Sequence, residues 1–179
     1  MNFSRLLSVL TLAAAALAQD KGAIEKVAPY YPTPETIVAR MLELGGLKAG
    51  EKMFDLGSGD GRIVIMAAQK YHADAVGVEM DQDLCKQSTE KIRRLGLEKT
   101  AHIVKGDLFK ESYSSADLLT IYLLPESNKK LAPVLEKQLK TGARVVAHDF
   151  QLPWTAEKVE TIDDDGEGRS HTLYLYRIK

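Results

Sequence analysis

The stretch best suited to chemistry is DLGSGDGR, which places three glycines at alternate positions (Gly57, Gly59 and Gly61) beside two acids, Asp55 and Asp60. Glycine-rich turns between a strand and a helix commonly bind nucleotides, because glycine lets the backbone approach the ligand closely. A dinucleotide-binding turn has the spacing GxGxxG and holds a pyrophosphate. At roughly 4–6 Å from the acids, a pyrophosphate would be repelled by about one to a few kcal/mol. S-adenosylmethionine carries an ammonium and a sulfonium and no phosphate, so the acids favour this cofactor.

Two further acids each follow a predicted strand. Glu79 lies 20 residues after Gly59, a position that suits hydrogen bonds to the two hydroxyls of a ribose. Asp107 follows the next predicted strand, where its carboxylate can accept a hydrogen bond from the adenine amino group. Taken singly, a glycine-rich turn can be a turn without a ligand, and an acid at a strand end can be a helix cap. Their occurrence at successive strand ends indicates a cofactor site.

The elements that must position these residues alternate between strands and helices. Residues 34–44 carry an apolar stripe that predicts a helix, with Thr33 as its cap and glycines at 45–46 as its end. The last two apolar segments, 158–163 and 171–178, flank a turn-rich loop and predict a hairpin. Buried strands are predicted at 52–57, 74–80, 102–107, 117–124 and 143–150, and further helices at 61–72, 81–95 and 127–140.

This order of elements predicts an α/β fold with a Rossmann-like, mostly parallel sheet, helices on both faces and an antiparallel C-terminal edge hairpin. Ligands of such sheets bind at the carboxyl ends of the strands. The short stretch 151–157 leaves no room for a full helix between the fifth and sixth strands. We therefore expect an open face on the acceptor side, which suits a macromolecular acceptor.

The acceptor site is expected just after the fourth and fifth strands. Tyr122 and Glu126 of YLLPE, and Asp149 in HDF, are the candidate catalytic residues. An amine must lose its proton before it accepts a methyl group, and lysine has a reference pKa near 10.4, so an acid that takes or orients the proton fits the chemistry. Glu126 has an alternative role as a first-turn acid that stabilises the next helix. His148, a further candidate beside Asp149 at the end of the fifth strand, has an alternative role as a structural hydrogen-bonding residue.

Composition limits the class of protein. The chain has 179 residues, 45% hydrophobic and 27% charged, which is typical of one globular domain. Its net charge of -1 and the absence of a basic block argue against a nucleic-acid partner. The single cysteine, Cys85, excludes an internal disulfide and a cysteine-based zinc site, and the four histidines show no metal-binding spacing. No metal is predicted.

The N-terminus reads as a separate segment. An apolar run of 13 residues, 6–18, follows Arg5 and ends in a small-x-small cleavage pattern. This run is too short to span a bilayer and has the length of a signal-peptide core. We expect residues 1–18 to be a signal peptide or a membrane anchor and 19–179 to be a single domain. Export would place the domain in a periplasmic or secreted location, and an anchor would tether it to a membrane, with the cytoplasmic side not excluded.

DLGSGDGR, GVEM and GD, in this order, resemble the motifs of class I S-adenosylmethionine-dependent methyltransferases over residues 29–179. PYYPTPE, GDLFK and LKTGARVVAHDF more narrowly resemble a small family of methyltransferases. Its eukaryotic members are the lysine methyltransferases of the ATP synthase c-subunit and of the adenine nucleotide translocase. This resemblance implies that Tyr31 and Thr33 close over the methionine end of the cofactor, that Glu79 holds its ribose and that Asp107 and Leu108 hold its adenine. The full candidate cofactor-binding set is Tyr31, Thr33, Asp55, Gly57, Ser58, Gly59, Asp60, Gly61, Glu79, Met80, Asp107 and Leu108.

The resemblance favours a methyltransferase acting on a protein lysine, with a monomeric chain and a protein substrate, such as a membrane protein. The segment YLLPE departs from the eukaryotic members of the family and also lacks the Asn/Asp-Pro-Pro-aromatic motif of enzymes that act on amide or base nitrogens. A small-molecule methyltransferase and a non-catalytic cofactor-binding protein on the same fold remain alternatives. An NAD-dependent oxidoreductase is disfavoured by the turn spacing and by the acids.

Overall fold

The computed structural model describes residues 30–179. The predicted N-terminal leader and the expected domain boundary after residue 18 lie outside these residues. Within them, no helix combines the length and the apolar character that crossing a bilayer requires.

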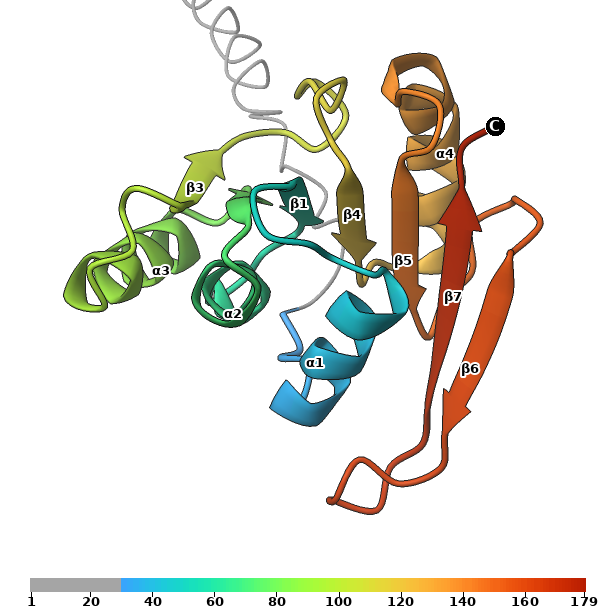
Figure 1. Cartoon of the computed structure of the whole chain (residues 1–179), viewed down its shortest axis with the longest axis horizontal. Helices are drawn as coiled ribbons and strands as arrows, with labels where there is room; N and C mark the ends of the chain where they lie inside the picture. The colour runs from blue at the N-terminus through green and yellow to red at the C-terminus, as the bar shows by residue number, and fades with distance from the viewer. Residues whose placement is uncertain (1–29) are drawn as a thin grey trace, which may run out of the picture.

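One seven-stranded sheet with the order β3-β2-β1-β4-β5-β7-β6 forms the centre of the fold (Figure 1). Strands β1 to β5 pair in parallel, whereas β7 lies antiparallel to both β5 and β6. The predicted mostly parallel sheet with an antiparallel C-terminal hairpin is confirmed, and β6 is its edge strand. The strands span Lys52–Leu56 (β1), Asp74–Glu79 (β2), Ala101–Lys105 (β3), Leu118–Ile121 (β4), Arg144–His148 (β5), Lys158–Ile162 (β6) and His171–Arg177 (β7).

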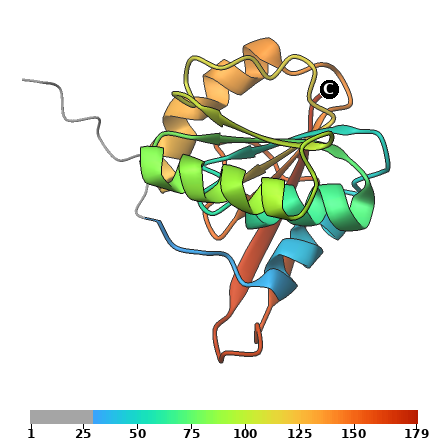
Figure 2. The same cartoon turned by 90° about the vertical axis from the view of Figure 1, so that its left-hand side faces the viewer.

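Helices cover both faces of the sheet, as predicted. In the described part of the chain they span Glu35–Leu44 (α1), Arg62–Tyr71 (α2), Gln82–Arg94 (α3) and Pro125–Gln138 (α4). The first three pack on one face and α4 packs on the other, so that Figure 2 shows α4 above the sheet and α1 and α3 below it. The segment 149–157 joins β5 to β6 without a helix, as its short sequence predicted.

The core consists of two apolar layers, one on each side of the sheet. Met53 of β1 packs on the side of α1 and α2, and the next residue, Phe54, packs on the side of α4. Successive side chains of a strand point to opposite faces, so a strand covered on both faces is apolar throughout instead of alternating. On the α4 side, Leu131 and Leu135 are fully buried against the sheet.

The N-terminal caps of α3 and α1 differ in how well the local sequence indicates them. Asp81 caps α3, because its carboxylate accepts hydrogen bonds from the backbone N–H groups of Asp83 and Leu84 at 2.8 and 3.1 Å. The predicted cap of α1 is wrong: Pro34 occupies the N-cap position, with no side-chain hydrogen bond, and Thr33 lies one residue outside the helix. The Thr33 hydroxyl instead lies 3.4 Å from a ring nitrogen of His148 at the end of β5. A predicted local contact is thus replaced by a contact across the fold.

Candidate active site

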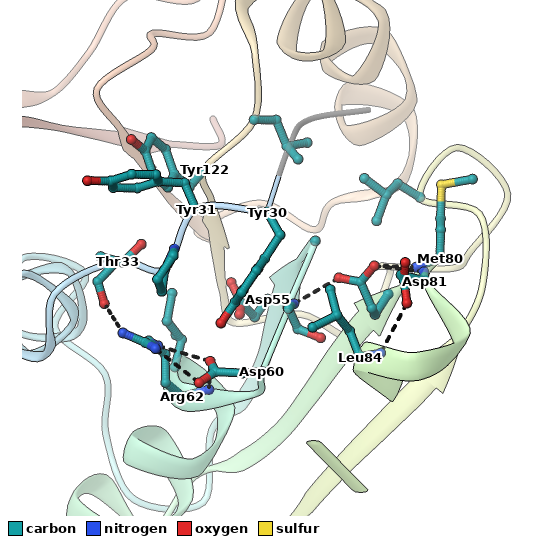
Figure 3. A pocket seen from close by; sticks show the side chains of 18 of the residues that line it. Tyr30, Tyr31, Thr33, Asp55, Asp60, Arg62, Met80, Asp81, Leu84 and Tyr122 are labelled. Atoms are coloured by element: carbon teal, nitrogen blue, oxygen red, sulfur yellow. Dashed lines mark hydrogen bonds and ion pairs between the residues drawn. The ribbon is translucent and has the colours of Figure 1, made fainter. Parts of the chain in front are cut away.

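A cavity of about 440 Å³ opens at the carboxyl ends of β1, β2 and β4 (Figure 3). Its volume lies within the usual range for small-molecule and cofactor sites, about 300–1,000 Å³. Of the predicted cofactor-binding and catalytic residues, those that line it are Tyr31, Thr33, Asp55, Gly57, Ser58, Gly59, Asp60, Glu79, Met80, Leu108 and Tyr122. The remaining lining residues, which the sequence did not single out, are Tyr30, Pro32, Arg62, Ile63, Asp81, Gln82, Leu84, Leu123, Leu124 and Phe150.

The glycine-rich turn forms the floor of the cavity between β1 and α2. Gly57, Gly59 and Gly61 all have positive φ, at 80°, 52° and 76°, a conformation that glycine adopts readily and that other residues adopt at a cost. Gly61 is the N-cap of α2 and lies outside the cavity lining. Above the turn, the ring of Tyr30 lies so close that a Cβ on Gly59 would sit 2.7 Å from its Cε2. The sequence pattern therefore reflects both backbone conformation and close packing.

Glu79 links the turn to the end of β2. Its Oε2 accepts a hydrogen bond from the Gly59 N–H at 2.8 Å, and its Oε1 accepts from the Met80 and Asp81 N–H groups at 2.9 and 2.8 Å. A carboxylate has about four acceptor positions, so roughly one remains for a ligand. Holding both hydroxyls of a ribose would require Glu79 to exchange one of these backbone contacts. The residue thus shapes the turn as well as facing the ligand.

Asp55 lies one residue before the end of β1, beneath the turn, where it is almost fully buried. Its Oδ1 accepts a hydrogen bond from the Thr120 hydroxyl of the neighbouring β4 at 2.7 Å. Burial raises the pKa of Asp55 to about 7; repulsion from Glu79 and Asp60 adds to this effect, and the hydrogen bond from Thr120 opposes it. A buried carboxylate of this kind gains stabilisation from a cationic ligand.

Asp60 is in a different electrostatic state. Its carboxylate accepts from Nε and Nη2 of Arg62 at 2.9 and 3.0 Å, and Nζ of Lys91 lies 3.5 Å away. Burial of Asp60 favours the neutral acid, but the hydrogen bonds and charge of Arg62, together with Lys91, outweigh it and hold the pKa of Asp60 below its usual value. Because Arg62 neutralises this acid, the negative charge available to a ligand comes from Asp55 and Glu79. Arg62, which the sequence pattern did not single out, thus offsets part of the repulsion expected from Asp60, although Asp60 still raises the pKa of Asp55.

The segment 30–34, here called the strap, lies across the mouth of the cavity. Nη1 of Arg62 donates a hydrogen bond to the carbonyl oxygen of Thr33 at 2.9 Å and fixes the strap to the start of α2. Tyr31 is 57% exposed, and the guanidinium of Arg169 from the β6–β7 loop stacks over its ring at 4.8 Å. Tyr31 and Thr33 are therefore located where a segment that closes over a ligand is expected.

Tyr122, Leu123, Leu124 and Phe150 form the end of the cavity beyond β4. The Tyr122 hydroxyl donates a hydrogen bond to Oδ2 of Asp149 at 3.2 Å, which places Asp149 directly behind the cavity wall although it does not line the cavity. Burial raises the pKa of Tyr122, and the charge of Asp149 adds to this effect. Two of the three predicted catalytic residues are thus brought together at one end.

Two other predicted site residues lie away from the cavity. Glu126 is exposed in the first turn of α4 and pairs with Nζ of Lys129 at 2.7 Å, an arrangement that fits its alternative role as a first-turn acid. Asp107 is outside the lining; its carboxylate accepts a hydrogen bond from the Phe109 N–H at 3.0 Å and pairs with Lys110 at 3.1 Å. The next residue, Leu108, is buried and does line the cavity. The adenine end therefore offers an apolar wall.

A buried polar cluster behind the strap was not foreseen, because its members are far apart in the sequence. His148 and His171, on the adjacent strands β5 and β7, lie with ring nitrogens 2.7 Å apart, and His171 also contacts Asp165. The sequence suggested scattered histidines, yet the antiparallel pairing of β5 with β7 brings these two together.

The cavity fits S-adenosylmethionine in charge and in polarity. The buried carboxylate of Asp55 and the acceptor position left on Glu79 suit a ligand with cationic and hydroxyl groups. The hydroxyl of Ser58 is buried and has no hydrogen-bond partner among residues 30–179, and such groups usually find one in a ligand or water. Leu108 and Leu84 supply apolar surface for a base.

Comparison with known proteins agrees with this arrangement. A family model described as the ANTKMT methyltransferase domain matches residues 55–158. The chain is 41% identical over 152 residues to a protein-lysine N-methyltransferase of Saccharolobus islandicus (strain REY15A), a match that covers 84% of this chain and 93% of that protein. It is 34% identical over 156 residues to the Homo sapiens lysine N-methyltransferase that is named for the ATP synthase c-subunit. That match covers 86% of this chain but only 64% of the human protein, so the chain spans less than two thirds of it.

A solved structure matches over nearly the same range. The crystal structure of an RNA methyltransferase from Salinibacter ruber in complex with S-adenosyl-L-homocysteine has a TM-score of 0.76 to this chain at 42% sequence identity. The match covers 83% of this chain and 94% of that one. The protein is therefore similar both to enzymes named for lysine acceptors and to one named for RNA.

Proposed function

The chain belongs to the family of ANTKMT methyltransferase domains and is an S-adenosylmethionine-dependent enzyme, and from that premise we propose that it methylates lysine side chains of a protein. The observation that carries the proposal is the hydrogen bond between Tyr122 and Asp149 at the wall of the cavity, beside an exposed apolar mouth. This pair offers an oxygen acceptor to an ammonium group, and the apolar residues around it suit the methylene chain of lysine.

The bound cofactor supplies an activated methyl group, and the chain's own residues bind and orient the two reactants. Asp55 and Glu79 would hold the positively charged and hydroxyl-bearing parts of the ligand, and the strap would lie over it. Alignment of two bound reactants supplies roughly 7–11 kcal/mol of a reaction barrier, so few dedicated catalytic groups are required. This agrees with a site built mainly from backbone turns and carboxylates.

The acceptor amine must be neutral when it reacts. Leu123, Leu124 and Phe150 line the end of the cavity beside Tyr122. Removal of water from an ammonium by such apolar residues lowers its pKa. The Tyr122 hydroxyl is already committed as a donor to Asp149, so its oxygen is oriented to accept a hydrogen bond from the incoming group. Tyr122 thus holds the amine, Asp149 orients the Tyr122 hydroxyl from behind the wall, and Glu126 is not required.

We propose a macromolecular acceptor because residues 30–179 leave the mouth of the cavity beside the strap uncovered. Leu124 is 41% exposed and Tyr31 is 57% exposed at this mouth, and the segment 149–157 adds no helix over it. A membrane protein is the substrate we favour, and the similarity to a relative named for lysine methylation of the ATP synthase c-subunit supports a protein acceptor. The proposal includes a monomeric enzyme whose residues 1–18 direct it to, or hold it at, a membrane.

Transfer of a tritiated methyl group from S-adenosylmethionine by the full-length chain tests this proposal. The acceptor pools are a membrane-protein fraction, total RNA and a metabolite extract. We expect label in protein, and mass spectrometry should place the added methyl groups on lysine. The variant Tyr122→Phe, which keeps the ring but loses the hydroxyl, should reduce transfer at least tenfold while retaining cofactor binding. Label in RNA or in metabolites, with none in protein, would contradict a lysine acceptor, and the RNA outcome would agree with the name of the Salinibacter ruber protein.

A further inference from the structure

A chain of four side chains leads from the cavity wall into the β6–β7 loop. Oγ1 of Thr33 lies 3.4 Å from Nδ1 of His148, and Nε2 of His148 lies 2.7 Å from Nδ1 of His171. Nε2 of His171 lies 3.0 Å from Oδ2 of Asp165. All four side chains are buried, and only Thr33 lines the cavity. The function proposed above uses none of the last three.

The contact between the two imidazoles is a hydrogen bond and not a pair of metal ligands. Asp149 lies close enough to both rings for the three residues to be considered as a metal site, with ligand atoms within 4.8 Å of one another. Two nitrogens on one tetrahedral zinc ion, each about 2.0–2.1 Å from the metal, are roughly 3.3 Å apart. The observed 2.7 Å between His148 and His171 is too short for that arrangement and normal for a hydrogen bond.

The carboxylate of Asp165, at the far end of this series of side chains, fixes the direction of every hydrogen bond in the series. The hydrogen bond from His171 holds the pKa of Asp165 at about 2, so Asp165 is ionised and accepts only. Nε2 of His171 must therefore carry the proton. One proton lies between the two facing nitrogens in the uncharged pair, so Nδ1 of His171 is then the acceptor and Nε2 of His148 is the donor.

A second carboxylate lies beside the contact between the two rings. Oδ2 of Asp149 is 3.5 Å from Nε2 of His148 and also 3.5 Å from Nδ1 of His171, so it stabilises the proton between these nitrogens without deciding which ring carries it. Burial lowers the pKa of His148 to about 4, so the ring is neutral and its Nδ1 has only a lone pair. The Thr33 hydroxyl must then donate its single proton to Nδ1 of His148. Towards the cavity, Thr33 is left with acceptor lone pairs alone.

We propose that Asp165, His171 and His148 act as positioning residues that lock the Thr33 hydroxyl as a hydrogen-bond acceptor, so that this wall of the cavity selects an ammonium group. Tyr122 follows the same rule, because its proton is committed to Asp149 and Arg169 also donates towards its oxygen. Both hydroxyls on the cavity wall are thus set to receive an N–H donor. A ligand that presents a carboxylate or carbonyl oxygen at Thr33 would meet lone pairs and lose affinity.

The ammonium has two sources, the amino-acid end of the cofactor and the side chain of the acceptor. Binding of S-adenosylhomocysteine in the absence of a lysine substrate distinguishes the two, because only the cofactor-derived ammonium is then present. Its deaminated analogue, with hydrogen in place of the ammonium, is the matched ligand. Calorimetry with the full-length chain compares Thr33→Val, which removes the hydroxyl at nearly constant shape, with Thr33→Ser, which keeps it. Thr36→Val is the control, since Thr36 donates to the backbone oxygen of Asp165 at 3.1 Å and lies outside the chain of four.

If the cofactor is the source, Thr33→Val should weaken S-adenosylhomocysteine about 10- to 100-fold and its deaminated analogue less than threefold, the loss expected for a hydrogen bond to a charged group. Thr33→Ser and Thr36→Val should stay within threefold of wild type. If the acceptor is the source, binding of S-adenosylhomocysteine is unchanged and Thr33→Val raises KM for a lysine peptide about tenfold or more. This second arm rests on the proposed function. A Thr33→Val variant that changes neither quantity overturns the proposal.

The tautomers give a readout that does not depend on any substrate. Ring-nitrogen NMR at pH 8 should show His148 and His171 both protonated on Nε2 in the wild-type chain. In Asp165→Asn the side-chain amide can donate as well as accept, so we expect part of the population with Nδ1 protonated instead. Protonation of wild-type His148 on Nδ1 would overturn the inference. If the enzyme methylates no lysine, the proposed function fails. The NMR and S-adenosylhomocysteine results still decide whether the four hydrogen-bonded side chains orient the Thr33 hydroxyl.

Discussion

Replacement of Asp55 by asparagine should stabilise the ligand-free protein at alkaline pH and weaken its hold on the cofactor. Asp55 is only 3% exposed, and its burial, with smaller contributions from Glu79 and Asp60, raises its pKa from the ordinary 3.8 to about 7. The hydrogen bond from Thr120 opposes this rise but does not cancel it. The folded protein therefore holds a carboxyl group that resists ionisation.

The sign of the effect follows from proton binding. Because the pKa of Asp55 is higher in the folded than in the unfolded state, the folded state binds more protons between pH 3.8 and 7, and the free energy of unfolding falls as pH rises through that window. At about 1.36 kcal/mol for each pKa unit, the full loss is about 4 kcal/mol. Asparagine carries no charge and its amide oxygen can still accept from Thr120, so the variant escapes most of this loss.

Urea unfolding at pH 5 and pH 8 measures the stability term, and calorimetry with S-adenosylmethionine at pH 8 measures the binding term. At pH 8 we expect Asp55→Asn to be more stable than wild type by up to about 4 kcal/mol and to bind the cofactor about 10- to 100-fold more weakly. Asp117→Asn is the control: although burial opposes it, the hydrogen bond from Lys140 holds the pKa of Asp117 below its usual value, so this change should destabilise at pH 8. An Asp55→Asn protein that is less stable than wild type at pH 8, or that binds the cofactor equally well, would refute the reasoning.

Three further predictions concern single residues. Glu79→Ala should weaken S-adenosylmethionine by about 1.5–3 kcal/mol in calorimetry, the usual loss for a hydrogen bond to a charged group; an unchanged affinity would remove Glu79 from the site. Glu126→Gln should leave the rate of methyl transfer within about twofold, because its carboxylate is exposed and paired with Lys129, and a large loss of kcat would restore it as a catalytic candidate. Leu131→Ala should lower the free energy of unfolding by about 2–5 kcal/mol in urea, since Leu131 is fully buried on the side of α4 that packs on the sheet; a change below about 1 kcal/mol would contradict that packing.

The fold could be predicted because its signals are local and agree with one another. The apolar strands, the glycine-rich turn after Asp55 and the hairpin at the C-terminus each require only neighbouring residues. The carboxyl ends of parallel strands meet at one edge, so residues after β1, β2 and β4 were expected together before their distances were known. Asp55, Glu79 and Tyr122 accordingly line one cavity.

The remaining features depend on contacts between distant parts of the chain. Thr33 has the residue type and position of a helix cap, but His148, 115 residues away, takes its hydroxyl. Arg62 neutralises Asp60 because α2 begins directly after the turn, and a pattern of glycines and acids does not show where the arginine points. His148 and His171 meet only because β7 pairs antiparallel with β5.

Glu126 and Asp107 show the limit of arguments from sequence order alone. Both follow strands, as the site residues do, yet the carboxylate of Glu126 extends from the first turn of α4 into solvent. Asp107 accepts a hydrogen bond from the Phe109 N–H in its own loop. An acid after a strand can therefore face a ligand or stabilise its own loop or helix start, and only the direction of its side chain distinguishes these two roles.

Calorimetric titration of the full-length chain with S-adenosylmethionine, and separately with NAD, tests the central claim most directly. The account predicts that S-adenosylmethionine binds and NAD does not, because Asp55 and Glu79 attract a cationic ligand and repel a pyrophosphate. It further predicts that affinity for S-adenosylmethionine rises between pH 6 and pH 8, as Asp55 ionises near pH 7. Binding of NAD, or of neither ligand, would contradict the assignment of the cavity and of the charges that define it.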